Sequence, residues 1–372
     1  MIMDRDNLYN FSSGPSMLPL EILERAQAEM LSYKDTGLSV MELQPRSEEY
    51  LEILRGAEEN LRKLINIPAN YKILFLKGDA TDQYAAIPMN LLSAHRCADY
   101  IVSGKQSKRA CDEAKKYGDI AIAASSGGSS PPYSTVPLTK RSDFRPDADY
   151  VHICYNNMVY GTKFHYIPDT GNIPLVCDMT SCFCSEPIDI TKFGLVYADA
   201  KVNVSPAGLA IVIVRNDLIG SARKDTPAML DYKNLVELGP EGNTAPIWSI
   251  YIAKLVMEWI LSVGGLEDMK RRNEKKASLL YDYLDSQGQS YYTSPVDKKC
   301  RSMMNVAFVI GDGELDRKFT EGAAERGLLN LAGDPTVGGM CASLYNSMTY
   351  EGVEELIEYM KEFVKNNPKI QR

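Results

Sequence analysis

Short runs of apolar, often β-branched residues alternate along the chain with longer segments whose apolar residues recur every three or four positions. Runs of the first kind predict strands, and segments of the second kind predict helices. An alternation of strands and helices is typical of crossover units in a largely parallel sheet. The predicted strands of this sheet cover residues 72–76, 100–102, 120–124, 150–154, 175–178 and 210–214, with another ending just before Lys201.

Two helices precede the first of these strands. The pattern predicts a helix over 19–33, with Leu20, Leu23, Met30 and Leu31 in its apolar stripe, and a second helix from Ser47 to the residues before Pro68. The strand 72–76 is followed by Gly78-Asp79-Ala80-Thr81 and by another helix start near Asp82. A strand, a tight turn and a helix start together present backbone N–H groups to an anion.

The last third of the chain has its own pattern. A helix over about 247–263 leads to further predicted elements at 271–284, 303–310, 314–326, 341–344 and 350–366. Because 372 residues exceed what one hydrophobic core usually serves, two domains are expected. The division that we predict is a large domain over 16–260 and a small domain made of 1–15 and 261–372.

Composition narrows the class of protein. With 45% hydrophobic residues, 24% charged residues and a net charge of -8, the chain resembles an ordinary globular protein, and nucleic acid is not the expected partner. No apolar run approaches the ~20 residues that span a bilayer, and residues 1–6 do not resemble a secretory signal, so a cytoplasmic protein without a membrane partner is expected. Eight cysteines lack paired C-x-x-C spacing. The cysteines at 177, 182 and 184 around Asp178 are therefore interpreted as buried reduced thiols, and no metal site is predicted.

Lys201 is the residue with the most specific chemistry. It follows a predicted strand and precedes the turn Pro206-Ala207-Gly208. A lysine at a strand end can form a Schiff base with the aldehyde of a cofactor if its amine faces the pocket. The register of this segment therefore bears directly on function.

The segment around Lys201 also carries a family resemblance. Residues 197–209, YADAKVNVSPAGL, resemble the pattern YAGAQKNIGPAGL of the phosphoserine aminotransferase family, and the ungapped matches are Tyr197, Ala198, Ala200, Asn203, Pro206, Ala207, Gly208 and Leu209. Residues 10–15 (NFSSGP), 39–42 (SVME), 215–232 and 342–346 (ASLYN) also resemble that family. The resemblance implies the α/β architecture of fold-type I aminotransferases: a large domain with a mostly parallel seven-stranded sheet between helices, and a smaller C-terminal α+β domain. It also implies a homodimer.

The resemblance implies pyridoxal phosphate as the cofactor and assigns roles to several positions. Asp178 matches the acid that holds the pyridine nitrogen, and Ala80 and Thr81 match the phosphate cradle. The pair Asn243-Thr244 matches residues that reach a phosphate from the neighbouring subunit. Ser13 and Arg46 match substrate-binding positions, Arg46 being the arginine that contacts the substrate phosphate.

Other positions depart from the family pattern. Val202 stands where the family has its Schiff-base lysine, and Lys201 stands on the family's glutamine. Gln106 replaces a stacking tryptophan, Met158 a threonine, Pro45 a histidine, Asp334 and Pro335 a His-Arg pair, and Cys341 the arginine that grips the substrate α-carboxylate. Asp79 and Asp82 add two carboxylates beside the cradle, whose charge opposes a bound anion. These departures predict a phosphoserine-aminotransferase-like protein with a lost or repurposed transamination site, a pseudoenzyme that binds another small ligand or acts as a regulatory paralogue.

Two alternatives remain open. The chain is an active phosphoserine aminotransferase of serine biosynthesis if Lys201 serves as the Schiff-base lysine. Successive strand residues point to opposite faces, so this shift by one residue turns the amine away unless a bulge near Asp199 restores its direction. The third hypothesis is a hetero-oligomer in which the chain lends Arg46 and Asn243-Thr244 to an active paralogue.

Overall fold

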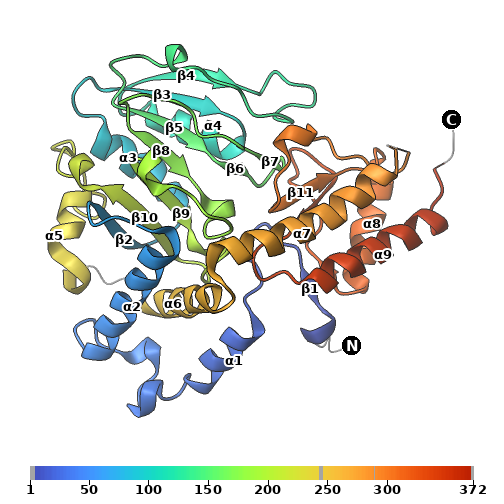
Figure 1. Ribbon diagram of the computed structural model, residues 1–372, viewed down its shortest axis with the longest axis horizontal. Coiled ribbons are helices and arrows are strands. Elements are labelled where there is room, and N and C mark those ends of the chain that lie inside the picture. Colours follow the sequence, from blue (N-terminus) through green and yellow to red (C-terminus); the bar gives the residue numbers. More distant parts are fainter. Residues whose placement is uncertain (1–4, 243–245, 289, 370–372) are drawn as a thin grey trace.

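The computed structural model describes residues 5–242, 246–288 and 290–369 and is built around one large sheet (Figure 1). The sheet has seven strands in the order β2-β10-β9-β8-β5-β3-β4. β10 is antiparallel to both of its neighbours, and every other pair is parallel. The predicted mostly parallel sheet is therefore confirmed. Its strands are β2 (Tyr71–Lys77), β3 (Cys97–Val102), β4 (Asp119–Ser125), β5 (Tyr150–Cys154), β8 (Leu175–Asp178), β9 (Leu195–Asp199) and β10 (Leu209–Arg215).

Helices cover both faces of this sheet. α2 (Glu48–Ile65) and α6 (Ile247–Ser262) pack on one face, and α3 (Gln83–Leu91), α4 (Lys105–Ala114) and α5 (Tyr232–Gly242) pack on the other. Successive residues of β9 divide between the faces: Val196 belongs to the first core and Tyr197 to the second. Such strands, buried on both sides, read as continuous apolar runs in the sequence.

The first helix is shorter than predicted. α1 covers Leu20–Ala28, and the prediction of a helix to residue 33 is wrong. Ser32, inside the predicted range, is extended with φ of −154° and ψ of 99°, and the positive φ of Lys34 and Asp35, 46° and 61°, then turns the chain toward α2. The predicted stripe is also partly wrong, because Leu20 and Leu31 are 47% and 85% exposed whereas Ile22 and Ala26 are buried.

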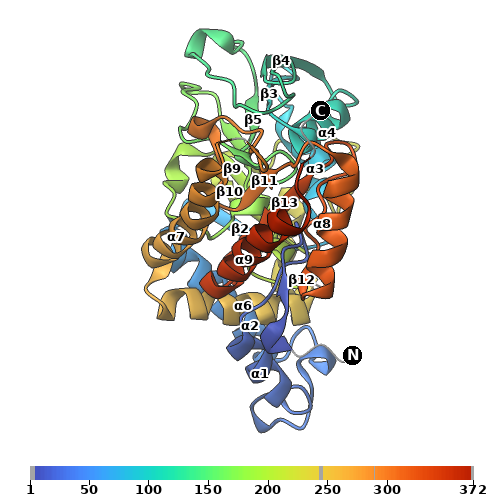
Figure 2. The ribbon, with the colours of Figure 1, turned by 90° about the vertical axis from the view of Figure 1, so that its right-hand side faces the viewer.

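The C-terminal helices lie to the right of the large sheet in Figure 1 and in front of it in Figure 2. β11 (Asn305–Phe308) and β13 (Met340–Ser343) pair antiparallel, and β1 (Tyr9–Asn10) pairs parallel with β12 (Leu328–Leu329), so the N-terminal segment lies against this part of the chain. The predicted division into domains stays a prediction. The helices of the C-terminal part are α7 (Gly265–Ser286), α8 (Gly313–Glu325) and α9 (Tyr350–Asn366). Earlier in the chain, β6 (Asn156–Asn157) and β7 (Thr162–Lys163) make a small antiparallel hairpin.

The length and hydropathy of the helices bear on whether the chain can cross a membrane. Among the described residues, no single helix is long and apolar enough to cross a bilayer. α6 and α7 meet that test only as a pair, and they are bent by 84° relative to each other.

Candidate functional site

A cavity of about 240 Å³ lies where several strands of the sheet end. β2, β3, β5, β8 and β9 run in the same direction, so their carboxyl ends meet at one edge. Ligands of open α/β sheets usually bind in the crevice outside such an edge. The lining brings together sequence-predicted residues from distant segments: Ser13, Ala80, Thr81, Gln106, Asp178 and Lys201. A larger cavity of about 360 Å³, between α2, β2 and α5, contains no sequence-predicted site residue.

Asp178 ends β8 at the floor of this cavity. Asp178 is only 2% exposed, and its Oδ1 accepts a hydrogen bond of 2.9 Å from the backbone N–H of Thr180. Burial raises the pKa of Asp178 to about 6, and the nearby carboxylate of Asp199 adds to the rise. The carboxyl group therefore has its midpoint of ionisation close to neutral pH and also caps a local turn.

Asp79 occupies the turn predicted to bind an anion. Its Oδ1 accepts a hydrogen bond of 2.6 Å from the backbone N–H of Thr81 and a second bond from the Thr81 hydroxyl. Burial alone would raise the pKa of Asp79, but these hydrogen bonds, helped by the positive charges of Lys201 and Arg109, hold it below its ordinary value. The chain's own carboxylate thus uses donors that were expected to receive an anionic ligand.

Lys201 lines the cavity through a turn and not through a strand. β9 ends at Asp199, its pairing with β10 is regular to that residue, and a 3-10 turn covers Ala200–Val202. The expectation that a bulge near Asp199 is needed is therefore wrong, because strand alternation no longer governs side-chain direction after Asp199. The Nζ of Lys201 lies 2.6 Å from Oδ2 of Asp199, in the same cavity.

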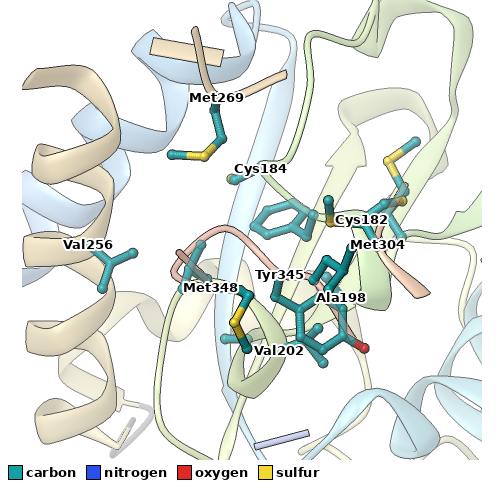
Figure 3. Packing of buried hydrophobic residues seen from close by; sticks show 14 of the residues in the cluster. Cys182, Cys184, Ala198, Val202, Val256, Met269, Met304, Tyr345 and Met348 are labelled. Carbon is teal, nitrogen blue, oxygen red and sulfur yellow. The ribbon is translucent and has the colours of Figure 1, made fainter. Parts of the chain in front are cut away.

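Val202 is part of the hydrophobic core at the edge of the cavity. It is 1% exposed and belongs to the core cluster that contains Ala198, Tyr345 and Met348 (Figure 3). Its backbone carbonyl accepts a hydrogen bond from the hydroxyl of Ser16. At this position the chain supplies an isopropyl group with no nucleophile.

The remaining predicted residues fall into three groups. Ser13 and Gln106 line the cavity, and the Oε1 of Gln106 is buried without a hydrogen-bond partner among the described residues. Arg46 is exposed on the segment before α2 and is not among the lining residues. Asn243 and Thr244 lie outside the described residues.

A second cavity of about 310 Å³ adjoins the first and shares Ser13 and Met158 with it. Asp334, Pro335 and Cys341 line it. The Cys341 thiol donates to the carbonyl of Met158 at 3.5 Å, and the Asp334 carboxylate pairs with Lys105 at 2.7 Å. The positions where the family pattern has cations thus carry a thiol, a ring and a carboxylate that is already paired.

Tyr84 and Arg109 are among the lining residues that the sequence did not single out. Tyr84 in the first turn of α3 is 6% exposed, and no hydrogen bond of its hydroxyl to another described residue is present. The guanidinium carbon of Arg109, on α4, lies 5.8 Å from the Tyr84 ring centre. Their positions just after the ends of β2 and β3 were available as a signal, since helices that follow such strands begin at the same edge of the sheet.

The cysteines around Asp178 are buried. Cys177, Cys182 and Cys184 are each less than 7% exposed and form no disulfide. Burial raises the pKa of all three thiols. Their neutral form therefore packs as a small apolar group, in the manner the sequence predicted.

Comparisons with known proteins identify the family. The model of the class-V aminotransferases matches residues 8–356. A phosphoserine aminotransferase of Ectopseudomonas mendocina is 47% identical over 359 residues, which cover 96% of this chain and 98% of the relative. The chain belongs to the phosphoserine aminotransferase family. A second such relative, from Azotobacter vinelandii, is 46% identical over 361 residues.

Solved structures of phosphoserine aminotransferases have the same fold. The enzyme from Bacillus circulans subsp. alkalophilus superposes with a TM-score of 0.93 at 40% identity, covering 97% of this chain and 99% of that one. The enzyme from Trichomonas vaginalis, solved with pyridoxal phosphate bound, gives 0.88 at 36% identity, covering 95% and 99%. The predicted fold-type I architecture is thereby confirmed. Taken alone, the comparisons favour an active phosphoserine aminotransferase over a protein that has lost this activity.

Proposed function

We propose that this chain is a phosphoserine-aminotransferase-like protein whose cleft binds a small ligand without carrying out the family's standard transamination. The observation that supports this proposal is that the Asp79 carboxylate accepts hydrogen bonds from both the N–H and the hydroxyl of Thr81. The relatives are phosphoserine aminotransferases and favour an active enzyme instead, so the proposal rests on the residues of this cleft.

Pyridoxal phosphate, which the family implies, has a ring end and a phosphate end, and the residues of this cleft differ in how well they fit each. The ring end fits in part: Asp178 is a buried carboxyl group that can hold a pyridine nitrogen, and Lys201 brings an amine into the same cavity. Gln106 there offers an amide in place of a planar ring. An amide contributes less than an aromatic face to holding a flat cofactor.

The phosphate end does not fit. A phosphate in the cradle would meet the Asp79 carboxylate, which already holds the Thr81 donors, and two like charges at such short range repel strongly. Lys201 and Arg109 offset part of this charge, and the Lys201 ammonium is also paired with Asp199 at 2.6 Å. The residues of this cleft therefore do not fit the phosphorylated cofactor in this arrangement, and we derive no reaction step through it.

The residues at the substrate end of the cleft also differ from those that the family resemblance assigns to substrate binding. Cys341 is a neutral thiol at the position that the resemblance assigns to a carboxylate-binding arginine, since burial raises its pKa to about 12. Loss of one arginine–carboxylate pair in a partly buried site costs roughly 2–5 kcal/mol. A phosphorylated amino acid thus lacks both its carboxylate partner here and, at Asp334 and Pro335, its phosphate partners.

An active aminotransferase that uses Lys201 is the second candidate. It is favoured by the family relationship and by the position of Lys201, which lines the cavity together with Asp178. For this function the Lys201 amine would have to leave Asp199, and Asp79 would have to release Thr81. Each of these changes breaks a charged hydrogen bond, which costs about 1.5–3 kcal/mol.

A turnover assay separates the two candidates. The purified protein is saturated with pyridoxal phosphate and given phosphoserine and 2-oxoglutarate, with an established phosphoserine aminotransferase as the positive control. We expect no visible cofactor absorbance after dialysis and no glutamate formation. A stable cofactor band together with sustained turnover would establish the second candidate and overturn our proposal.

The assembly is also a proposal. A homodimer agrees with the family, and 16–260 and the remainder would form its large and small domains. A complex with an active paralogue would instead place Arg46 and Asn243-Thr244 at the partner's site. Mass measurement in solution, followed by mixing with such a paralogue and measuring its activity, distinguishes the two assemblies.

A further inference from the structure

The charges and hydrogen-bond acceptors of the cavity at the sheet edge indicate the chemistry of its ligand. Three carboxyl groups line it, those of Asp79, Asp178 and Asp199, against two cations, Lys201 and Arg109. Because Asp199 and Lys201 are paired with each other, the carboxyl groups of Asp79 and Asp178 remain to face a ligand, together with the Arg109 guanidinium.

Individual atoms support this description. Oδ1 of Asp79 holds both Thr81 donors, and no hydrogen bond to Oδ2 from another described residue is present. Gln106 adds its buried and unpartnered Oε1 to the same cavity. These two oxygens match N–H groups of a ligand and do not match the oxygens of a phosphate.

The position of the Tyr84 side chain is independent support for a bound ligand. Its side chain is buried and lines the cavity, while its hydroxyl has no partner among the described residues. The hydroxyl oxygen itself is not fully buried, so it is accessible from the cavity, and a tyrosine hydroxyl in such a place usually finds a hydrogen-bond partner. A bound molecule with a polar head and a flat or aliphatic body would supply the missing contact and would fill the space beside the ring.

We propose that this cavity binds a small organic cation, an ammonium or amidinium compound without a phosphate group, whose charged head lies between Asp79 and Asp178 beside the Tyr84 hydroxyl. This inference rests on the proposed function, because it takes the cradle to be closed to phosphate. The guanidinium carbon of Arg109 lies 5.8 Å from the Tyr84 ring centre, and its positive charge also lowers the pKa of Asp79, so it offsets part of the negative charge that the ligand head would meet.

Three probes with one ring and different heads test the charge preference: benzylamine, benzyl alcohol and benzyl phosphate. Binding of each to the full-length protein is measured by titration calorimetry and by ligand-observed NMR at pH 7.5. Benzylamine is expected to bind about tenfold or more tightly than the neutral alcohol, because one desolvated charge pair contributes at least that factor. Benzyl phosphate is expected not to bind.

Asp79→Ala tests the residue assigned to the cation. In this variant the affinity for benzylamine should fall by about tenfold or more. Benzyl phosphate should begin to bind, because the Thr81 donors become available. Asp189→Ala is the matched control: Asp189 accepts from the N–H and hydroxyl of Thr191 at 3.0 and 2.5 Å in the same kind of turn, but on the exposed surface and outside the cavity. It should leave all three affinities unchanged.

The outcomes separate the two proposals. Equal binding of amine and alcohol, tighter binding of benzyl phosphate by the unaltered protein, or no binding of any probe would each overturn the cation site. None of these results would by itself restore transamination, which the turnover assay measures. An Asp79→Ala protein that fails to fold is replaced by Asp79→Asn, which keeps the acceptor to Thr81 and removes only the charge.

Discussion

Lys201 and Asp199 form an ion pair of 2.6 Å at the point where β9 ends. The Asp199 side chain is 4% exposed and the Lys201 side chain 28% exposed. Burial raises the pKa of Asp199, and the Lys201 ammonium opposes that rise. The lysine that suggested covalent chemistry in the sequence thus has a structural partner of its own.

Removal of Lys201 is expected to destabilise the fold through Asp199. Lys201→Met leaves a buried carboxylate without its cation and should lower the free energy of unfolding by about 2 kcal/mol, less than for a fully buried pair because Lys201 is partly exposed. The double variant Asp199→Asn/Lys201→Met should recover most of this loss. Urea denaturation of both single variants and the double variant gives the coupling energy, and a value near zero would show that the pair has no structural role.

Asp178 is expected to make stability depend on pH. Its pKa is raised to about 6 in the folded protein, so the folded state holds a proton that the unfolded state releases above about pH 4. Stability from this group is therefore fully present below pH 4 and is lost as pH rises through 6, by about 3 kcal/mol in all. Asp178→Asn, which keeps the acceptor for the Thr180 N–H, should remove this loss.

The measurement is urea denaturation at pH 4.5 and pH 7.5. Asp178→Asn should be more stable than the unaltered protein at pH 7.5 and close to it at pH 4.5. Asp147→Asn, at an exposed position, serves as the control and should change little at either pH. An equal effect of Asp178→Asn at both pH values would contradict the assignment of the titrating group.

Asn156 is expected to hold the cavity wall to the C-terminal part of the chain. Its Nδ2 donates to Asn305 Oδ1 at 2.8 Å and to the hydroxyl of Ser181 at 2.7 Å, while its Oδ1 accepts from the hydroxyl of Ser302 at 2.5 Å. Asn156→Leu has a similar volume but leaves buried polar atoms unpaired, at a cost of about 2–4 kcal/mol.

Calorimetric melting of Asn156→Leu checks this prediction against Asn216→Leu, a substitution at an exposed position that should change stability by less than about 0.5 kcal/mol. Comparable melting temperatures for the two variants would mean that the polar contacts of Asn156 contribute little. A large loss for Asn156→Leu alone would identify these contacts as the link between the two parts.

The sequence predicted the sheet well because its inner strands β3, β5, β8, β9 and β10 are buried on both faces and read as apolar runs. It predicted the length of α1 poorly, since nothing in the helical period signals the end at Ala28 or the extended backbone of Ser32. At the site, the family resemblance assigned cofactor-binding positions to Asp178 and Thr81, and both line one cavity, which Lys201 lines as well. The direction of Lys201 was missed because alternation along a strand was extended past Asp199, into a 3-10 turn that has a different period.

Contacts between side chains were the least predictable part. That Asp79 and Asp82 stand beside the cradle was visible in the sequence, but only the folded turn shows which of them takes the Thr81 donors. Tyr84 and Arg109 were not singled out, because a tyrosine and an arginine near helix starts are ordinary in sequence. Their importance comes from the closed space that the sheet edge creates around them.

The central claim is that the cleft does not engage the phosphorylated cofactor through Lys201. The most direct measurement incubates the protein with saturating pyridoxal phosphate, reduces with borohydride and maps the labelled peptides by mass spectrometry, with Lys201→Met as the control. We predict no cofactor adduct on Lys201 above the level on other exposed lysines. A stoichiometric adduct on Lys201 that disappears in Lys201→Met would contradict this claim and would support an active aminotransferase.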